Sequence, residues 1–178
     1  EEETSDLKST RVPRVPRHPM LENMSLNFFD DVSDLNFIGV TSGEVVLDTE
    51  NSNDGWRIIG VDSTKYGDIG LNAIDLSYSS SLSTSHGATG NYSTAIGYNT
   101  ISNNFATFAM GFESIASGNT STAIGAHASA TGSTSTSIGW TTIASGNTST
   151  AIGAYAVASG VAATSIGYET KADGDYSN

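Results

Sequence analysis

The chain has 178 residues and carries 19 acidic against 7 basic side chains, for a formal net charge of −12. An acidic surface argues against binding the backbone of DNA or RNA, which needs lysine and arginine, so no nucleic-acid partner is expected. The absence of cysteine excludes disulfides and thiolate metal sites. No apolar run is long enough for a transmembrane helix, so no membrane insertion is expected in this segment.

Residues 1–19 form the first predicted segment, an extended arm or linker rich in proline and arginine. Pro13, Pro16 and Pro19 each fix their own φ and bias the preceding residue away from helix. The segment is therefore expected to resemble polyproline. Two roles remain open at this point: a solvated linker, or an arm that docks on a neighbouring subunit.

Residues 20–87 are expected to form a β-rich cap or connector that covers the first coil of the repeats. Residues 26–29 suggest a short helical turn, and Trp56 is interpreted as a core anchor of this cap rather than a ligand platform. The candidate strands are residues 45–47, 56–59 and 73–76, and the turn signals are residues 53–55 and 65–68.

Residues 88–178 repeat with a fixed period of 14, set by glycines that each follow Ala-Ile, Ala-Met or Ser-Ile. These glycines are interpreted as the coil turns: Gly97, Gly111, Gly125, Gly139, Gly153 and Gly167. A second glycine series lies halfway between them, with Asn104 in one slot, which suggests left-handed turn residues there as well. Helix-pair repeats are longer, so the unit predicts one coil of a β-solenoid made of two half-turns.

Side chains alternate across a strand, and this parity separates two kinds of column. Four columns contain only Ala, Ser or Thr, which implies an interior too narrow for leucine. The opposite face carries one unbroken apolar column: Ile96, Met110, Ile124, Ile138, Ile152 and Ile166. An outward ladder of this size would be an unusual patch on a monomer, so we expect it to form the interface of a homotrimer or other cyclic oligomer. The alternative is that the faces are reversed and isoleucine lies inside a monomeric solenoid.

The repeat resembles the YadA-like head of trimeric autotransporter adhesins, whose pattern runs Ser-x-Ala-Ile-Gly followed by a second Ser-x-Ala-x-Gly half. The first half is present at residues 93–97, 121–125 and 149–153, and residues 115–126 recur identically at 143–154. The last residues, 175–178, match the opening of a further coil, so we expect the repeats to continue beyond this segment.

The resemblance implies an all-β, left-handed parallel β-roll in which three chains pack with the isoleucine column toward the trimer centre. It also implies an extracellular location, on a cell surface or on a phage-like or other particle fibre. Heads of this family bind the extracellular matrix or host surfaces, so the implied partner is a host-surface protein or glycan. The sequence leaves open which receptor is bound and which kind of particle carries the fibre.

No catalytic constellation is present, and the chain is expected not to be an enzyme. His18, His86 and His127 are far apart in the sequence, and there is no nucleophile elbow, zinc-protease motif or phosphate loop. No metal site or cofactor is expected, although Ca²⁺ is considered at two acidic groups that do not match the calcium-loop pattern. These groups are Asp30, Asp31 and Asp34, and Asp48, Glu50 and Asp54.

Two further columns are candidates for a binding surface. Aromatic residues follow the Ile-Gly pair and are considered as ligand-facing side chains or as contacts across the trimer seam: Tyr98, Phe112, Trp140 and Tyr168. Thr-x-Thr pairs begin at Thr120, Thr134 and Thr148 and are typical of ice-binding solenoids. Each pair, however, continues on the same face into an isoleucine of the apolar column.

The sequence therefore predicts a structural and adhesive fibre segment that attaches through a repetitive trimeric surface. The first alternative is a self-assembling extracellular filament, joined by the N-terminal arm or by end-to-end stacking. The second alternative is an ice-binding β-solenoid.

Overall fold

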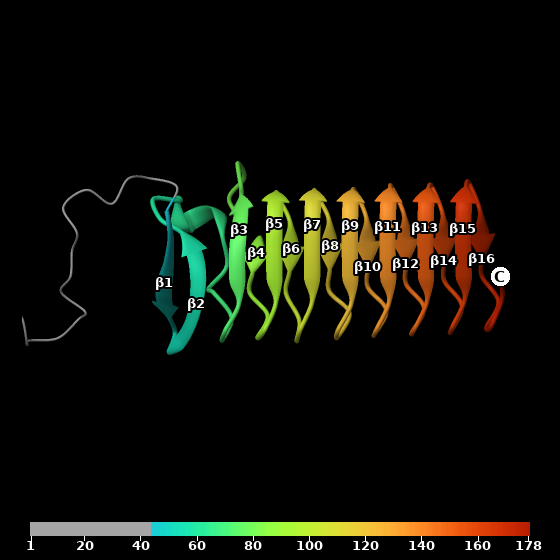
Figure 1. Cartoon of the computed structure of the whole chain (residues 1–178), viewed down its shortest axis with the longest axis horizontal. Coiled ribbons are helices and arrows are strands. Elements are labelled where there is room, and N and C mark those ends of the chain that lie inside the picture. The colour runs from blue at the N-terminus through green and yellow to red at the C-terminus, as the bar shows by residue number, and fades with distance from the viewer. Residues whose placement is uncertain (1–43) are drawn as a thin grey trace, which may run out of the picture. The chain divides into compact units, whose positions relative to one another are not determined.

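The computed structural model describes residues 44–178, in which an N-terminal hairpin is followed by a stack of coils that each contain one long and one short strand (Figure 1). Among residues 44–178 the one helical element is a short 3-10 helix, η3 (Ser63–Lys65), and the other residues lie in strands, turns or connecting segments. The long strands are β1 (Val45–Glu50), β2 (Asn53–Ile58), β3 (Ile74–Tyr78), β5 (Thr94–Tyr98), β7 (Phe108–Phe112), β9 (Thr122–Ala126), β11 (Thr136–Trp140), β13 (Thr150–Ala154) and β15 (Thr164–Tyr168). The short strands are β4 (Gly87–Ala88), β6 (Ile101–Ser102), β8 (Ile115–Ala116), β10 (Ser129–Ala130), β12 (Ile143–Ala144), β14 (Val157–Ala158) and β16 (Lys171–Ala172).

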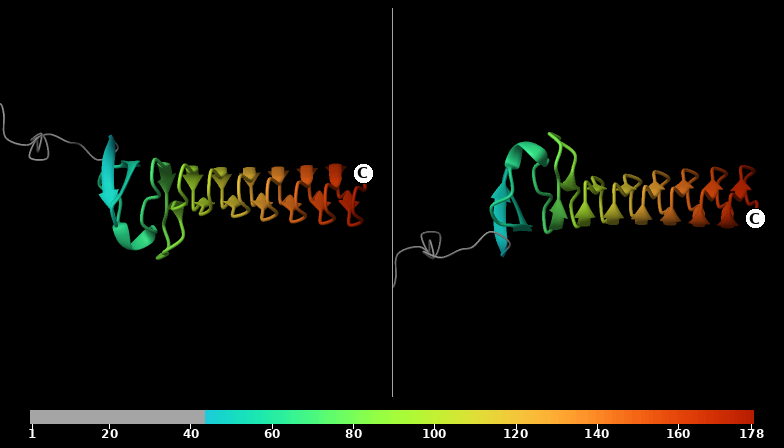
Figure 2. Two further views of the ribbon diagram at one scale, coloured as in Figure 1. Left: turned by 90° about the horizontal axis from the view of Figure 1, so that it is seen from below. Right: turned by 90° about the horizontal axis from the view of Figure 1, so that it is seen from above.

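Two sheets run along the stack, and Figure 2 shows them on opposite sides of it. The long strands form a nine-stranded sheet in the order β1-β2-β3-β5-β7-β9-β11-β13-β15, and the short strands form a seven-stranded sheet from β4 to β16. Every pairing is parallel except that of β1 with β2. Ile96 pairs with Met110 and Met110 with Ile124, so one coil is 14 residues and the predicted solenoid period is confirmed.

The interior of the stack holds the small-residue columns, as the parity of the strands predicted. Ala95, Ala109, Ala123, Ser137 and Ala151 are buried in a line down the long-strand sheet, and Ala116, Ala130, Ala144 and Ala158 oppose them from the short-strand sheet. The large apolar column of the long strands lies on the outer side. The reversed assignment, with isoleucine inside, is therefore wrong.

The two halves of a coil are unequal, which differs from the expected pair of similar half-turns. The long strand of each repeat has five residues and the short strand has two. The backbone N–H groups of Ser117 and Gly118 both donate to the carbonyl of Ala130, at 3.0 and 3.2 Å. Because two successive donors share one acceptor, the chain bends there and the ladder of the second half ends early.

The repeated glycines lie inside the long strands rather than at the corners. Gly125 is the fourth residue of β9 and has a φ of +133°. A β-carbon built on it would lie 1.9 Å from the carbonyl oxygen of Gly139 in the next coil. The corner residue with left-handed backbone comes two positions later, at His127 with a φ of 55°. Glycine is thus required by the close approach of successive coils, in addition to its backbone conformation.

The second glycine series has the same cause, without a left-handed backbone. A β-carbon on Gly132 would lie 2.0 Å from the carbonyl oxygen of Gly146. The left-handed residues of that corner are two positions further on, such as Thr134 with a φ of 54°. Asn104, which was interpreted as a left-handed residue, is not one; its side-chain Nδ2 donates to the carbonyl of Ser117 at 3.0 Å.

The N-terminal end of the described stack is closed by an antiparallel hairpin, β1–β2, whose two strands are joined by a tight turn at Asn51 and Ser52. Residues 53–55, read from the sequence as a turn, belong to β2, because the turn residues with positive φ precede them. Strands β1, β2 and β3 overlap the candidate strands at 45–47, 56–59 and 73–76. Residues 1–19, Leu26–Phe29 and the acidic group at Asp30 lie outside the described residues.

A buried ion cluster replaces the small interior residues beneath this hairpin. Arg57 is almost fully buried; its Nη1 lies 2.8 Å from Glu50 Oε1 and its Nε lies 3.4 Å from Asp75 Oδ2. Arg57 Nη2 also donates to the carbonyl of Gly67 at 2.8 Å. Asp75 pairs with Ala95 in register, so the cluster occupies the same interior column as the alanines. The first coil is therefore held by charge pairs where later coils are held by small apolar contacts.

The close contact between coils gives a first prediction. We expect Gly132→Ala to lower the free energy of unfolding by about 3 kcal/mol, because the added methyl group meets a carbonyl oxygen of the next coil. Gly174→Ala is the matched control: it lies in the same column, and its nearest neighbour would be Ser177 at 3.7 Å. Chemical denaturation of both variants measures the difference. Equal losses of stability in Gly132→Ala and Gly174→Ala would contradict the idea that glycine is required by the close approach of successive coils.

The buried cluster gives a second prediction. We expect Arg57→Met to cost about 3–5 kcal/mol of stability, because it leaves the carboxylate of Asp75 buried without a cation. The double variant Arg57→Met/Asp75→Leu removes both charges and is expected to recover most of that loss. Thermal and urea unfolding of the three proteins provide the test. An Arg57→Met protein as stable as the parent would show that the ion cluster does not contribute to the free energy of unfolding.

Candidate functional site

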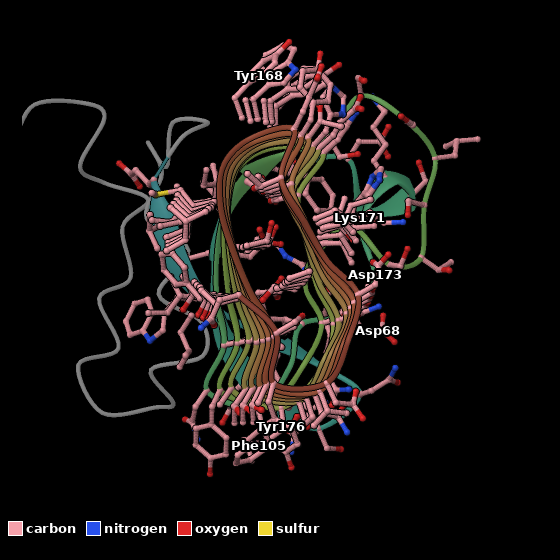
Figure 3. All side chains as sticks on the ribbon, turned by 90° about the vertical axis from the view of Figure 1, so that its right-hand side faces the viewer. Asp68, Phe105, Tyr168, Lys171, Asp173 and Tyr176 are labelled. Atoms are coloured by element: carbon pink, nitrogen blue, oxygen red, sulfur yellow. The ribbon has the colours of Figure 1, made fainter. Side chains whose placement is uncertain are left out.

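The interior leaves no room for a ligand, so the candidate sites lie on the outer surface of the stack. Figure 3 looks along the stack and shows small side chains inside the coil and large ones outside it. Two outer features run along its length. We call them the apolar face, on the long-strand sheet, and the aromatic ridge, at the corner where the long strands end.

The apolar face consists of the outward side chains at the centre of the long strands. Its members are Leu76, Ile96, Met110, Ile124, Ile138, Ile152 and Ile166, which are paired in register from β3 to β15. The side chain of Ile166 is 62% exposed, and the members between neighbouring coils are half-buried by one another. In the described chain this column therefore faces solvent.

The apolar face continues into the hairpin. Leu47 pairs with Trp56, and Trp56 pairs with Ile74, so the three side chains lie on the same outer side of the sheet. Leu47 is 56% exposed and Trp56 is 48% exposed. The prediction that Trp56 anchors the core of the cap is wrong, because its strand neighbour Arg57 points inward and Trp56 must point outward. The outer apolar surface thus extends beyond the repeats.

The threonine pairs do not form a flat ladder of two columns. Thr122 lies in β9 and points outward, whereas Thr120 lies at the corner with a φ of 55°. The column of Thr122 is interrupted by Phe108 in β7. The geometry therefore lacks the regular flat threonine surface that an ice-binding solenoid requires.

The aromatic ridge is longer and more continuous than the sequence indicated. Tyr98, Phe112, Trp140 and Tyr168 are the last residues of their long strands rather than turn residues, and the column between them contains Ala126 and Ala154. His127 and Tyr155, one residue further along, fill these two gaps, and Tyr78 of β3 extends the series. The full ridge is Tyr78, Tyr98, Phe112, His127, Trp140, Tyr155 and Tyr168.

Neighbouring rings of the ridge are in contact along the stack. The ring centroids of Tyr98 and Phe112 are 5.2 Å apart with nearly parallel planes, and those of Phe112 and His127 are 5.3 Å apart, edge to face. The indole Nε1 of Trp140 donates to the hydroxyl of Tyr155 at 3.3 Å. Such pairs stabilise one another by about 0.5–1.5 kcal/mol each beyond burial. The exposed fraction remains large, at 53% for Trp140 and 68% for Tyr168.

The sequence contains a signal for the added members of the ridge. Wherever the residue after Ile-Gly is alanine, the next residue is His127 or Tyr155, so an aromatic ring is present in each coil at one of two adjacent positions. Only a comparison of both positions reveals the alternation. A search of a single column misses it.

The acidic residues considered for Ca²⁺ in the described part of the chain lie on two sides of the hairpin. The acidic residues 48, 50 and 54 are not brought together: Asp48 and Glu50 face Arg57, whereas Asp54 lies on the other side of the hairpin and accepts a hydrogen bond from Thr49. Among residues 44–178 no cluster of three His, Cys, Asp or Glu side chains has metal-binding geometry. His86 and His127, distant in the sequence, do line one cleft.

The described residues contain no helix that is long and apolar enough to cross a membrane. Their fold and surfaces define a class: an all-β repeat protein, built as a parallel solenoid with a narrow interior and its large side chains outside. Solenoids of stacked repeats present extended binding surfaces.

Comparison with known proteins identifies the family within this class. The family model for the YadA head domain repeat, which spans two copies, matches residues 88–103, 106–128, 130–156 and 158–177. The chain belongs to the YadA head domain repeat family, through a match that extends over residues 88–177, as the resemblance in sequence predicted. This is a family of structural, surface-exposed adhesin segments rather than of enzymes. The curated proteins provide no match to the chain.

Proposed function

We propose that the chain is a structural segment of a homotrimeric adhesive fibre, displayed outside the cell or on a phage-like particle. In the proposed assembly three left-handed rolls pack through their apolar faces, with Ile96, Met110, Ile124, Ile138, Ile152 and Ile166 toward the common axis. The fibre attaches to a host-surface protein or glycan through its remaining outer surface. Membership of the YadA head domain repeat family supports this proposal.

The observation that carries the trimer is the unbroken length of the apolar face. It spans all nine strands of the long-strand sheet and includes exposed leucine, tryptophan, isoleucine and methionine side chains. Soluble monomers rarely expose an apolar surface of this extent. Three copies related by a rotation axis can bury it completely, and closed symmetry limits the assembly to a defined size.

The aromatic ridge supports the adhesive part of the proposal. It borders the apolar face, at the ends of the same strands, and its rings remain largely exposed in the described chain. Exposed tyrosine and tryptophan combine a large apolar contact area with a polar group, which suits them to binding proteins or glycans. Three ridges on one trimer would raise avidity without any deep pocket.

One observation favours the filament as a second candidate. Strand β1 is the edge of the long-strand sheet among the described residues, and its Val45 and Leu47 are exposed. An extended segment from another subunit, such as residues 1–19, could add to this edge as an extra strand. Electron micrographs distinguish the two, because discrete short trimers exclude a filament.

Disruption of the apolar face tests the trimer. We expect Ile138→Asp to convert the trimer to monomers, because three unpaired carboxylates would be buried near the axis. Ile143→Asp is the matched control, because Ile143 is an outward isoleucine on the short-strand sheet. Light scattering of the parent and both variants gives their masses. A parent with the mass of one chain would overturn the trimer, as would an Ile138→Asp protein that remains three chains in size.

Removal of a ridge ring tests the adhesive surface. We expect Trp140→Ala to weaken attachment of the trimer to an immobilised extracellular-matrix preparation by about tenfold, because each trimer loses three exposed indole rings. Tyr92→Ala is the control, because Tyr92 is an exposed aromatic residue at the opposite corner, in contact with Phe105. The trimer mass is expected to stay unchanged in both. Full attachment by correctly assembled Trp140→Ala would show that the ridge is not the adhesive surface.

A further inference from the structure

One coil of the stack departs from the repeat and forms a cleft. Ile74 pairs with Thr94 across a coil of 20 residues, whereas Thr94 pairs with Phe108 across 14. The additional residues lie between β3 and β4, where the chain extends away from the stack in Figure 2. This loop, residues 79–86, and the outer side of the short-strand sheet line a cleft of about 370 Å³. The apolar face and the aromatic ridge continue from coil to coil, whereas the loop that forms this cleft lies in one coil.

The loop is held in place by hydrogen bonds at several points. The backbone N–H of Ser80 donates to Asn99 Oδ1 at 3.1 Å, and that of Ser83 donates to the carbonyl of Thr64 at 3.2 Å. The carbonyl of His86 accepts from Gly67 at 3.1 Å. The cleft is therefore formed before any ligand arrives, as is usual for small-molecule sites.

The wall on the loop side presents an imidazole nitrogen for hydrogen bonding. Nδ1 of His86 forms a hydrogen bond with the hydroxyl of Ser79 at 2.7 Å, and that hydroxyl also lies 3.1 Å from the carbonyl oxygen of Ser81. Burial holds the pKa of His86 below its usual value, so the ring is neutral near pH 7. The other ring nitrogen, Nε2, has no hydrogen-bond partner among residues 44–178, so it can accept from or donate to a ligand hydroxyl according to the tautomer of the ring.

The opposite wall supplies both a donor and an acceptor. Asn99 uses its Oδ1 to accept from Ser80, which leaves its NH₂ group to donate. Glu113 lies next to His127, with Oε2 and Nδ1 separated by 3.2 Å, and keeps further acceptor capacity. His127 is in turn fixed between the rings of Phe112 and Trp140. Aliphatic side chains of the short-strand sheet, Ile101 and Ile115, complete the lining.

We propose that this cleft binds a neutral pyranose, as one sugar unit of a surface glycan. A sugar hydroxyl both donates and accepts, which matches a site with Nε2 of His86, the amide of Asn99 and the carboxylate of Glu113 on facing walls. The aliphatic residues match the C–H face of a pyranose ring. Small-molecule sites in proteins have volumes of roughly 300–1,000 Å³, and this cleft falls at the lower end of that range, which suits a single sugar ring.

The charge of the cleft selects against anionic sugars. Glu113 is in its lining, and the whole chain has a formal charge of −12. A carboxylated sugar would be repelled by both, whereas an uncharged ring is not. This inference rests on the proposed adhesive function, since it names the ligand class that one part of the fibre would take.

The experiment is a titration of the purified, assembled chain with named sugars, in which saturation-transfer NMR detects binding. The neutral probes are D-glucose, D-galactose and N-acetyl-D-glucosamine, and the anionic probe is N-acetylneuraminic acid. The variants are Glu113→Gln, which keeps the side-chain shape and removes its charge, and Glu169→Gln as the matched control. Glu169 occupies the same corner position four coils away and is not part of the cleft lining.

We expect at least one neutral sugar to bind, and Glu113→Gln to weaken that binding by about tenfold through loss of a charge-assisted hydrogen bond. Glu169→Gln is expected to bind like the parent. The proposal is overturned if no neutral sugar binds, if the anionic sugar binds better, or if both variants weaken binding equally. Attachment of the same samples to the matrix preparation is measured in parallel. Attachment without sugar binding would reject the cleft and leave the adhesive function intact.

Discussion

The close approach of successive coils is the constraint on which the rest of the structure depends. A β-carbon at Gly125 or Gly132 would lie within 2.0 Å of a carbonyl oxygen in the next coil, so both positions accept only glycine. The narrow coil that results has room inside only for alanine, serine and threonine. The interior therefore stabilises the chain through many small contacts and backbone ladders rather than through a core of large side chains.

A narrow interior forces the large side chains outward. The isoleucine column, the hairpin residues Leu47 and Trp56, and the ridge of aromatic rings all lie on the outside, whereas soluble monomers rarely expose contiguous apolar patches of this size. The same property that makes the coil regular thus creates surfaces that need a partner. The proposed assembly of several chains and the proposed attachment to another surface would both follow from this one packing limit.

The N-terminal coil is where regularity ends and specificity becomes possible. There the interior holds Arg57 with Glu50 and Asp75 in place of small residues, and the chain carries the loop at residues 79–86. A repeated surface can bind repeated targets, whereas a cleft that occurs in one coil can recognise a single group. The N-terminal part of the described stack therefore combines the hairpin that closes it with a loop that departs from the 14-residue repeat.

The sequence by itself determined the coil period and the division of side chains into small and large columns, because these follow from local alternation along a strand. It favoured an outward Ile96 column but left the reversed assignment open, and the structure decided between the two. Tertiary structure decided what depends on contacts between coils: that Gly97 and its equivalents avoid a neighbouring carbonyl rather than form the turns, and that Trp56 is exposed. It also decided that His127 and Tyr155 complete the ridge and that His86 meets Glu113 across a cleft. Period and parity describe one strand, whereas distances between neighbouring coils arise only when the coils are stacked.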